Sequence, residues 1–285
     1  MSGGLLKKLW SLILLGALAS MLVGGSQALA TTFTLTHNGW TYSENISQQG
    51  LGDFKDTSNT DHMFQNWWWY RTNLDSAEKP LRTLVTMTSG GPNNVQLVFR
   101  EDAGSLPNAL LIRLNYMLTG VSANTAYVNI AWSVQHIYGQ LPQPITVDFF
   151  AYSDFDLNGT PGGDTAFPPL PVHVLYNEGG TVVDVIASHD HLQGYDIDSY
   201  PNLLSLLNDG TVYNVSGLGG GTGDMTNVFQ WRATIGLGQE LSGSLTKVLT
   251  LNTPPPPGPV IPEPGTWALM LSGLAPVVLR LRKKA

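Results

Sequence analysis

The stretch DFDLNG places three oxygen-bearing side chains at alternate positions, Asp154, Asp156 and Asn158. Carboxylate and amide oxygens at this spacing, followed by a glycine that permits a sharp turn, can surround a hard cation such as calcium. Asp164 is a fourth candidate ligand. The stretch is not an EF-hand, because it leaves a strand and because Thr165 occupies the position of the bidentate glutamate. It indicates either a calcium-stabilised β-loop or an Asx-rich turn without an ion.

A second candidate metal site is the pair His189 and His191, which would share one face of a strand. With His173 or His136 as a third ligand, such a pair could hold zinc or copper. The alternative is an exposed loop that binds no metal.

The run FQNWWWYRT carries three consecutive tryptophans. In a strand, Trp67 and Trp69 lie on one face while Trp68 and Tyr70 lie on the other. One interpretation is an aromatic platform on which sugar rings stack, with Arg71 bonding to hydroxyl groups. The other is that both faces are buried under sandwich layers or a crossing loop, because aromatic burial drives core formation.

Known enzyme motifs are absent from the sequence, which has no G-x-S-x-G, no H-E-x-x-H and no phosphate-binding glycine loop. We therefore expect a chain that is not an enzyme. Acidic residues are frequent enough to leave a secreted glycan hydrolase as an alternative. The absence of cysteine excludes cysteine nucleophiles and thiolate metal sites.

Negative charge dominates the central part of the chain. Residues 31–253 contain 8 basic and 20 acidic residues, a balance of 8 − 20 = −12. No Lys or Arg occurs from Leu114 to Trp231. Nucleic acid is excluded as a partner, because binding it requires clustered positive charge.

Short segments rich in Val, Ile, Thr and aromatic residues, separated by Gly, Asn, Asp or Pro, predict at least ten strands. In TAYVNIAWSV the residues Ala126, Val128, Ile130 and Trp132 would share a face. The fold class predicted for residues 31–252 is an all-β, antiparallel β-sandwich of jelly-roll type.

One helix is expected, in DSYPNLLSLLNDG, lying over a sheet edge. Ser199 would stand near its N-cap, and Leu203, Leu206 and Leu207 would face the sheet.

Both ends of the chain resemble targeting segments. Residues 1–30 have two lysines, an apolar stretch and a small-x-small site at Ala28 and Ala30, which together predict a cleaved signal peptide. Residues 253–261 are a proline-rich spacer of the extended polyproline type.

Residues 262–285 resemble the PEP-CTERM sorting signal. The likeness rests on Pro262-Glu263-Pro264, on the apolar stretch that follows, and on a basic end formed by Arg280, Arg282, Lys283 and Lys284. The basic end agrees with the positive-inside rule. The apolar stretch is short and contains Pro276, which suits a transient hold in the membrane better than a lasting span.

The resemblance implies export by the secretion machinery of a Gram-negative bacterium and a transient intermediate in the inner membrane. It further implies processing by an exosortase, a membrane transpeptidase that would recognise Pro262, Glu263 and Pro264. The mature protein would then reside at the cell surface or in the extracellular matrix. The sequence thus predicts an exported surface or matrix protein, with a carbohydrate-binding module for extracellular polysaccharide as the alternative. No cofactor is expected other than calcium.

Overall fold

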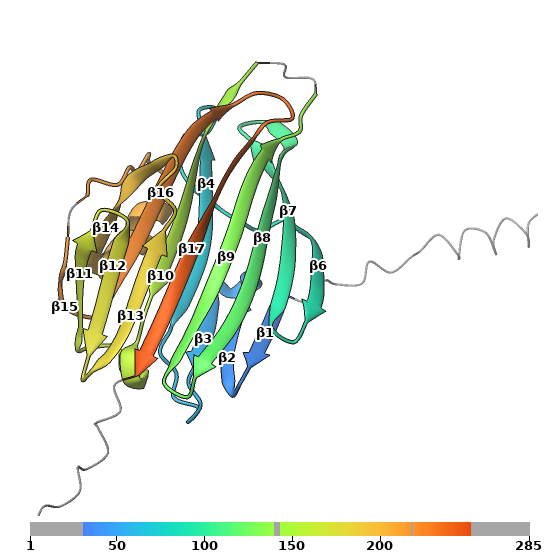
Figure 1. Cartoon of the computed structure of the whole chain (residues 1–285). Coiled ribbons are helices and arrows are strands. Elements are labelled where there is room, and N and C mark those ends of the chain that lie inside the picture. Colours follow the sequence, from blue (N-terminus) through green and yellow to red (C-terminus); the bar gives the residue numbers. More distant parts are fainter. Residues whose placement is uncertain (1–30, 140–142, 218, 252–285) are drawn as a thin grey trace, which may run out of the picture. The chain divides into compact units, whose positions relative to one another are not determined.

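The computed structural model describes residues 31–139, 143–217 and 219–251. These residues form two antiparallel β-sheets (Figure 1), which confirms the all-β prediction. No helix within the described ranges is both long and apolar enough to cross a bilayer. The predicted signal peptide, spacer and sorting segment lie outside the described residues, including Ala28, Ala30, Pro262, Glu263, Pro264, Arg280, Arg282, Lys283 and Lys284.

Sheet A has eight strands in the order β1-β2-β3-β4-β10-β16-β14, with β5 paired to β4. Their bounds are β1 (Thr32–His37), β2 (Trp40–Asn45), β3 (Leu51–Lys55), β4 (Gln65–Thr72), β5 (Lys79–Pro80), β10 (Ile145–Asp154), β14 (Leu192–Ser199) and β16 (Met225–Ile235). A short 3-10 turn, η1 (Ile46–Gln48), follows β2, and a second, η2 (Leu157–Gly159), follows β10.

Sheet B has nine strands in the order β15-β11-β12-β13-β17-β9-β8-β7-β6. Their bounds are β6 (Leu84–Gly91), β7 (Asn94–Ala103), β8 (Leu106–Ser122), β9 (Thr125–His136), β11 (Asp164–Leu170), β12 (His173–Glu178), β13 (Thr181–Ala187), β15 (Gly221–Gly223) and β17 (Glu240–Leu251). Much of this sheet is a meander of consecutive strands, and the two sheets are larger than the four-stranded sheets of a jelly roll.

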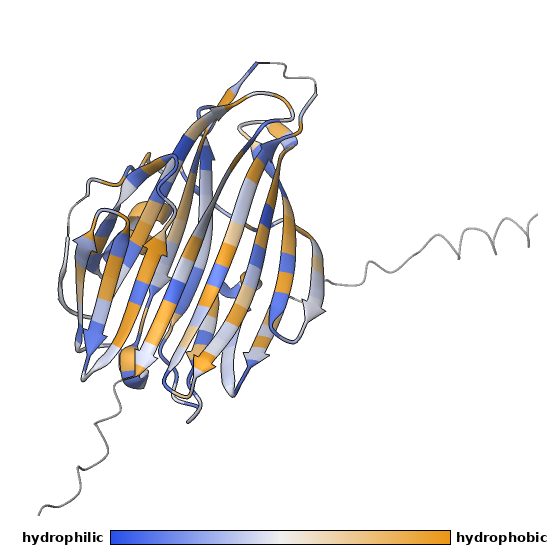
Figure 2. Cartoon of the chain, in the orientation of Figure 1, coloured by the Kyte–Doolittle hydropathy of each residue, from blue (hydrophilic) through white to orange (hydrophobic). Residues whose placement is uncertain are grey.

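Alternation along the strands produces the core between the sheets. In β9 the residues Ala126, Val128, Ile130 and Trp132 are all buried, as the sequence predicted, while the residues between them are more exposed. Figure 2 shows apolar and polar residues alternating along the neighbouring strands of sheet B.

Strand β4 departs from this rule, because all eight of its residues are buried. Trp68 faces sheet B, where its indole Nε1 donates to the hydroxyl of Tyr116 at 2.9 Å. Trp67 and Trp69 face outward, where the helix and the segment that follows it cover them. Both faces of this strand therefore lie in a hydrophobic core.

That cover is helix α2 (Asn202–Asn208). It begins later than the sequence predicted, since its N-cap residue is Pro201 rather than Ser199. Leu204 is buried in place of the expected Leu206, which is exposed. The helix packs on the outer face of sheet A, against aromatic residues of β4 and β10.

A polar network is buried between the sheets. The carboxylate of Glu44 accepts hydrogen bonds from Tyr42, Asn66 and Tyr116. The ammonium of Lys247 is buried too, donates to Asn66 Oδ1 at 2.7 Å and lies over the ring of Phe155. Asn66 thus joins the two charged residues.

Candidate metal centre

Three carboxylates converge at one end of sheet A. Asp154, Asp156 and Asp224 each place an oxygen within 4.8 Å of the others. Asp154 ends β10 and stands opposite Thr226 of β16. Asp224 precedes β16 by one position, so antiparallel pairing of these two strands brings together acids that are far apart in the sequence.

Asp164, the first residue of β11, is a fourth acid at this end. It pairs with Gly223, the residue before Asp224. Its side chain is 0% exposed and that of Asp154 is 1% exposed. Neither oxygen of Asp164 has a hydrogen-bond partner of normal geometry, although the Leu157 backbone N–H is close enough to favour its charged form. Oδ1 of Asp154 also has no partner. Two buried carboxyl groups thus present unpaired oxygens next to further acids.

The four acids hinder one another's ionisation. Burial, followed by the charges of Asp224 and Asp156, raises the pKa of Asp154 to about 8. Burial and the charge of Glu178 raise the pKa of Asp164 to about 7, and burial with Asp224 raises that of Asp156 to about 6. Without a cation, the charged forms of these groups are therefore destabilised.

The four carboxylates have no direct ion-pair partner in the described part of the chain. None of the ion pairs found within it involves these four carboxylates. The charge of Lys247 interacts with that of Asp154, but its ammonium hydrogen-bonds to Asn66. The arrangement fits a divalent cation with oxygen ligands.

The side chain of Asn158, a predicted ligand, does not join the cluster of acids. Its Nδ2 donates to the backbone oxygen of Glu178 at 3.1 Å, and its Oδ1 accepts from Thr181 Oγ1 at 2.7 Å. Asn158 has a φ of 59°, in the left-handed region, and it ties η2 to the turn between β12 and β13. Asp224 was not predicted as a ligand, because the sequence around it shows only an acid directly before a strand. Its partnership with Asp154 depends on long-range strand pairing.

A groove of about 450 Å³ opens beside the acidic cluster. Asp156 and Gly159 line it on the cluster side, and Asp53 and Asp61 line it as well. The remaining lining includes Phe64 and polar residues of β2 and η1. The volume falls within the range of roughly 300–1,000 Å³ that is typical of small-molecule sites.

Two exposed aromatic residues lie close to the cluster. Phe64 and Tyr200 are 40% and 39% exposed, and their ring centroids lie 6.2 Å apart in an edge-to-face arrangement. The backbone N–H of Phe64 donates to the carbonyl of Asp154 at 3.0 Å, and that of Tyr200 donates to the carbonyl of Asp224 at 2.8 Å. The end of β10 and the start of β16, which carry Asp154 and Asp224, therefore also hold the backbones of Phe64 and Tyr200 in place.

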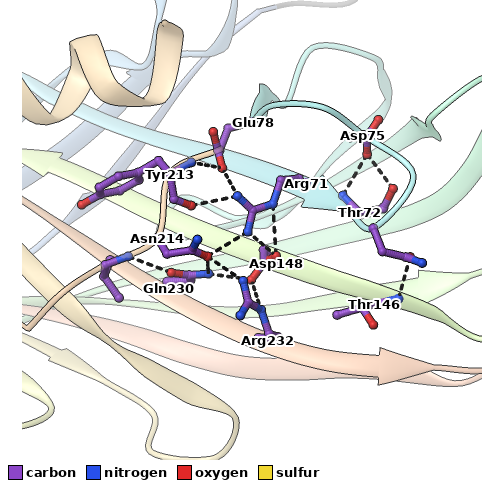
Figure 3. Close-up of polar contacts among 12 residues, drawn as sticks. Arg71, Thr72, Asp75, Glu78, Thr146, Asp148, Tyr213, Asn214, Gln230 and Arg232 are labelled. Carbon is purple, nitrogen blue, oxygen red and sulfur yellow. Dashed lines mark hydrogen bonds and ion pairs between the residues drawn. The ribbon is translucent and has the colours of Figure 1, made fainter. Parts of the chain in front are cut away.

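The predicted sugar platform of Trp67, Trp69 and Arg71 is wrong. The two indoles are 5% and 1% exposed beneath α2, so no sugar ring can reach their faces. Arg71 is buried and binds Asp148 and Glu78, and it also donates to the Tyr213 backbone oxygen (Figure 3). It fastens the segment after α2 onto the sheet.

The histidines do not form a metal site. His189 and His191 lie in an exposed turn, whereas His136 is buried and His173 pairs with Asp184. Across the described ranges, the one group of candidate ligands that converges is Asp154, Asp156 and Asp224.

No protein-family model matches this chain, and no curated protein matches it. Three solved structures show a distant likeness of fold. A bacterial glucoamylase complexed with acarbose gives a TM-score of 0.49 at 8% identity, over 79% of this chain and 31% of the glucoamylase. A GalM/aldose epimerase homologue from C. elegans gives 0.46 at 7% identity, over 78% and 99%. A polysaccharide lyase gives 0.44 at 9% identity, over 77% and 34%.

These structures correct one expectation. The missing motifs predicted that the chain is not an enzyme, but a glucoamylase and a polysaccharide lyase are among the proteins with a similar fold. The chain spans about a third of those two proteins. The likeness is too distant to assign an activity.

Proposed function

We propose that this chain is an exported protein whose β-sandwich binds calcium at Asp154, Asp156, Asp164 and Asp224. The observation that carries the proposal is the pair of buried carboxyl groups, Asp154 and Asp164, whose oxygens lack partners beside two further acids. Burying an ionised carboxylate without a partner costs several kcal/mol. A divalent cation would offset that cost and favour the ionised form of all four groups.

The chemistry of the ligand set favours calcium over other metals. All four candidate ligands are carboxylates, whereas zinc and copper prefer histidine or cysteine. Calcium accepts about six to eight oxygens in irregular geometry, and carboxylates can each supply one or two of them. Asp156 and Asp224 are half-buried, which leaves an exposed side for further oxygen ligands.

Thermal unfolding and titration calorimetry of the full chain test the site. We expect calcium to raise the melting temperature of the protein after EDTA treatment, because a ligand that binds only the folded state stabilises it by about 2.7 kcal/mol at a hundredfold excess over Kd. Asp224→Asn should abolish the rise, since it removes one ligand at the exposed side of the cluster.

Asp190→Asn is the matched control, because it removes an acid from an exposed turn. It should leave the calcium response unchanged. The absence of any shift or binding heat at millimolar calcium contradicts the proposal, and so does an equal response in Asp224→Asn.

We further propose the delivery route. The PEP-CTERM-like tail and the signal peptide would direct the chain through the inner membrane to an exosortase and then to the cell surface or matrix. Extracellular polysaccharide is the proposed partner class. The resemblance of residues 1–30 and 262–285 to targeting signals supports this route.

A second candidate function is glycan cleavage in the groove beside the cluster. The observation that favours it is the carboxyl pair Asp53 and Asp61. Burial and the neighbouring Asp53 raise the pKa of Asp61 to about 6. Burial alone would raise the pKa of Asp53, but hydrogen bonds with Asp61, Lys55 and Ser43 outweigh it and lower that pKa. The two carboxyl groups also hydrogen-bond to each other, so they would act as a dyad that shares one proton, with one member as acid and the other as base.

Release of reducing ends from soluble neutral polysaccharides tests this candidate. Asp61→Asn should lower the rate by about 10²–10⁴-fold, the usual contribution of a general acid or base. Asp190→Asn should have no effect. A wild-type chain that releases no product from any polysaccharide eliminates this second function and leaves the calcium proposal intact.

A further inference from the structure

The acidic cluster adjoins the groove. Asp156 belongs to both, since its carboxylate lies with Asp154 and Asp224 and also lines the groove. Asp154 and Asp164 are buried, so a cation bound to the cluster would be reached from the side of the half-buried Asp156 and Asp224. Calcium held by few protein ligands completes its shell with water or with ligand oxygens. A bound cation would therefore offer coordination positions to a molecule in the groove.

The aromatic pair provides an apolar contact beside the same groove. Phe64 lines the groove, and Tyr200 contacts Phe64 edge to face. The two rings, exposed side by side, form an apolar surface on which the apolar face of a ligand can pack. Because their backbones bond to those of Asp154 and Asp224, the rings stay close to the cation site.

The remaining lining matches a neutral, hydroxyl-rich ligand. Ser43, Asn45 and Gln48 can donate or accept hydrogen bonds, and Asp53 and Asp61 accept them. No Lys or Arg lines this groove in the described part of the chain. An anionic ligand would therefore meet the carboxylates of Asp53, Asp61 and Asp156, while the nearby Lys55 is already paired with Asp53 at 2.8 Å.

We propose that the groove binds a neutral glycan, with adjacent hydroxyls completing the coordination of the cation and a sugar ring packed on Phe64 and Tyr200. This inference rests on the proposed calcium site and names the ligand class of that site. Each hydroxyl replaces a water on the cation, and the C–H face of the sugar covers the exposed aromatic rings.

Affinity electrophoresis of the full chain in gels containing mannan, dextran or galactan tests the inference, with calcium or with EDTA. At least one of these neutral glycans should retard the protein in calcium and not in EDTA. The double variant Phe64→Ala/Tyr200→Ala should weaken retardation at least tenfold while keeping the calcium-induced rise in melting temperature. Asp224→Asn should lose both responses.

Phe167→Ala is the matched control, because Phe167 is an exposed phenylalanine on sheet B that does not line the groove. It should migrate as the wild type does. Three results would overturn the glycan inference: a calcium response with no retardation by any neutral glycan, retardation that persists in EDTA, or unchanged retardation of the double variant. In each case, the melting experiment shows separately whether the calcium site stands.

Discussion

Glu44 and Lys247 are two ionisable residues buried in one network between the sheets. Burial raises the pKa of Glu44 to about 7, although the charge of Lys247 acts in the opposite direction. Burial lowers the pKa of Lys247 to about 7, against the charge of Glu44. Near neutral pH the pair is thus poised between ionised and neutral forms, with Asn66 bonded to both.

The sign of each pH effect follows from proton binding. Between pH 4.5 and about 7 the folded state holds a proton on Glu44 that the unfolded state has lost. The contribution of Glu44 to the free energy of unfolding therefore decreases as the pH rises through this window. Between about 7 and 10.5 the unfolded state holds a proton on Lys247 that the folded state has released. In that window the contribution of Lys247 to stability increases with pH.

Lys247→Met removes the second effect. It also removes a charge that lowers the pKa of Glu44, so in the variant the loss of stability linked to Glu44 extends above pH 7 and adds to the difference from wild type. We expect the free energy of unfolding of the wild type, relative to that of this variant, to increase by roughly 2 kcal/mol from pH 7 to pH 9. Urea unfolding at the two pH values measures this difference. Arg100→Met, which removes an exposed charge, should show a difference from wild type that does not vary with pH. A flat result for Lys247→Met would mean that Lys247 keeps an ordinary pKa.

Some site residues were predictable from local spacing. Asp154, Asp156 and Asp164 follow one another within a short loop, and the sequence singled them out as candidate ligands. Asp224 was missed because its position depends on the pairing of β10 with β16. Asn158 was included because the motif ignores backbone conformation, which turns its side chain toward Glu178.

At the scale of elements, helix α2 encloses the outer aromatic face of sheet A. Leu207 is buried against a cluster that includes Trp67 and Trp69, while Leu206 on the same helix is 40% exposed. The helix itself is too short to be stable alone, so its burial against the sheet holds it in place.

Leu207→Ala should therefore lower the free energy of unfolding by about 2–5 kcal/mol, since it opens a cavity over the indoles. Urea unfolding followed by tryptophan fluorescence measures the loss. Leu206→Ala is the internal control and should change stability by less than about 0.5 kcal/mol. Equal effects of the two substitutions would contradict the packing of this helix.

The strands were predictable where one face is buried, because the alternation in β9 identifies the core side directly. The tryptophans of β4 gave no such direction, since both faces of that strand are buried. The sequence of β4 does not indicate which element covers Trp67. That element is a helix more than a hundred residues further along the chain. The order of strands in the sheets could not be predicted either, because it depends on pairing between segments far apart in the sequence. Strand β10, for example, pairs with both β4 and β16.

At the scale of the whole molecule, the proposed sorting route predicts that the chain is divided at its tail. Epitope tags placed on either side of Pro262 in the native host should separate, with the tag before it outside the cell and the tag after it in the membrane fraction. Replacing Glu263 by Ala should keep the two tags together, because it alters the proposed recognition motif. Co-purification of both tags from wild-type membranes would contradict cleavage.

The place of β17 in sheet B has a mechanical consequence. This strand lies between β13 and β9 rather than at an edge (Figure 1), and its pairing with β9 continues to Thr250. The proline-rich spacer follows it in the sequence. A pull on a tethered tail would load β17 along its length, so that hydrogen bonds to two neighbours resist the force together in shear. A domain held from this end would withstand drag better than one held by a strand that can be peeled away bond by bond.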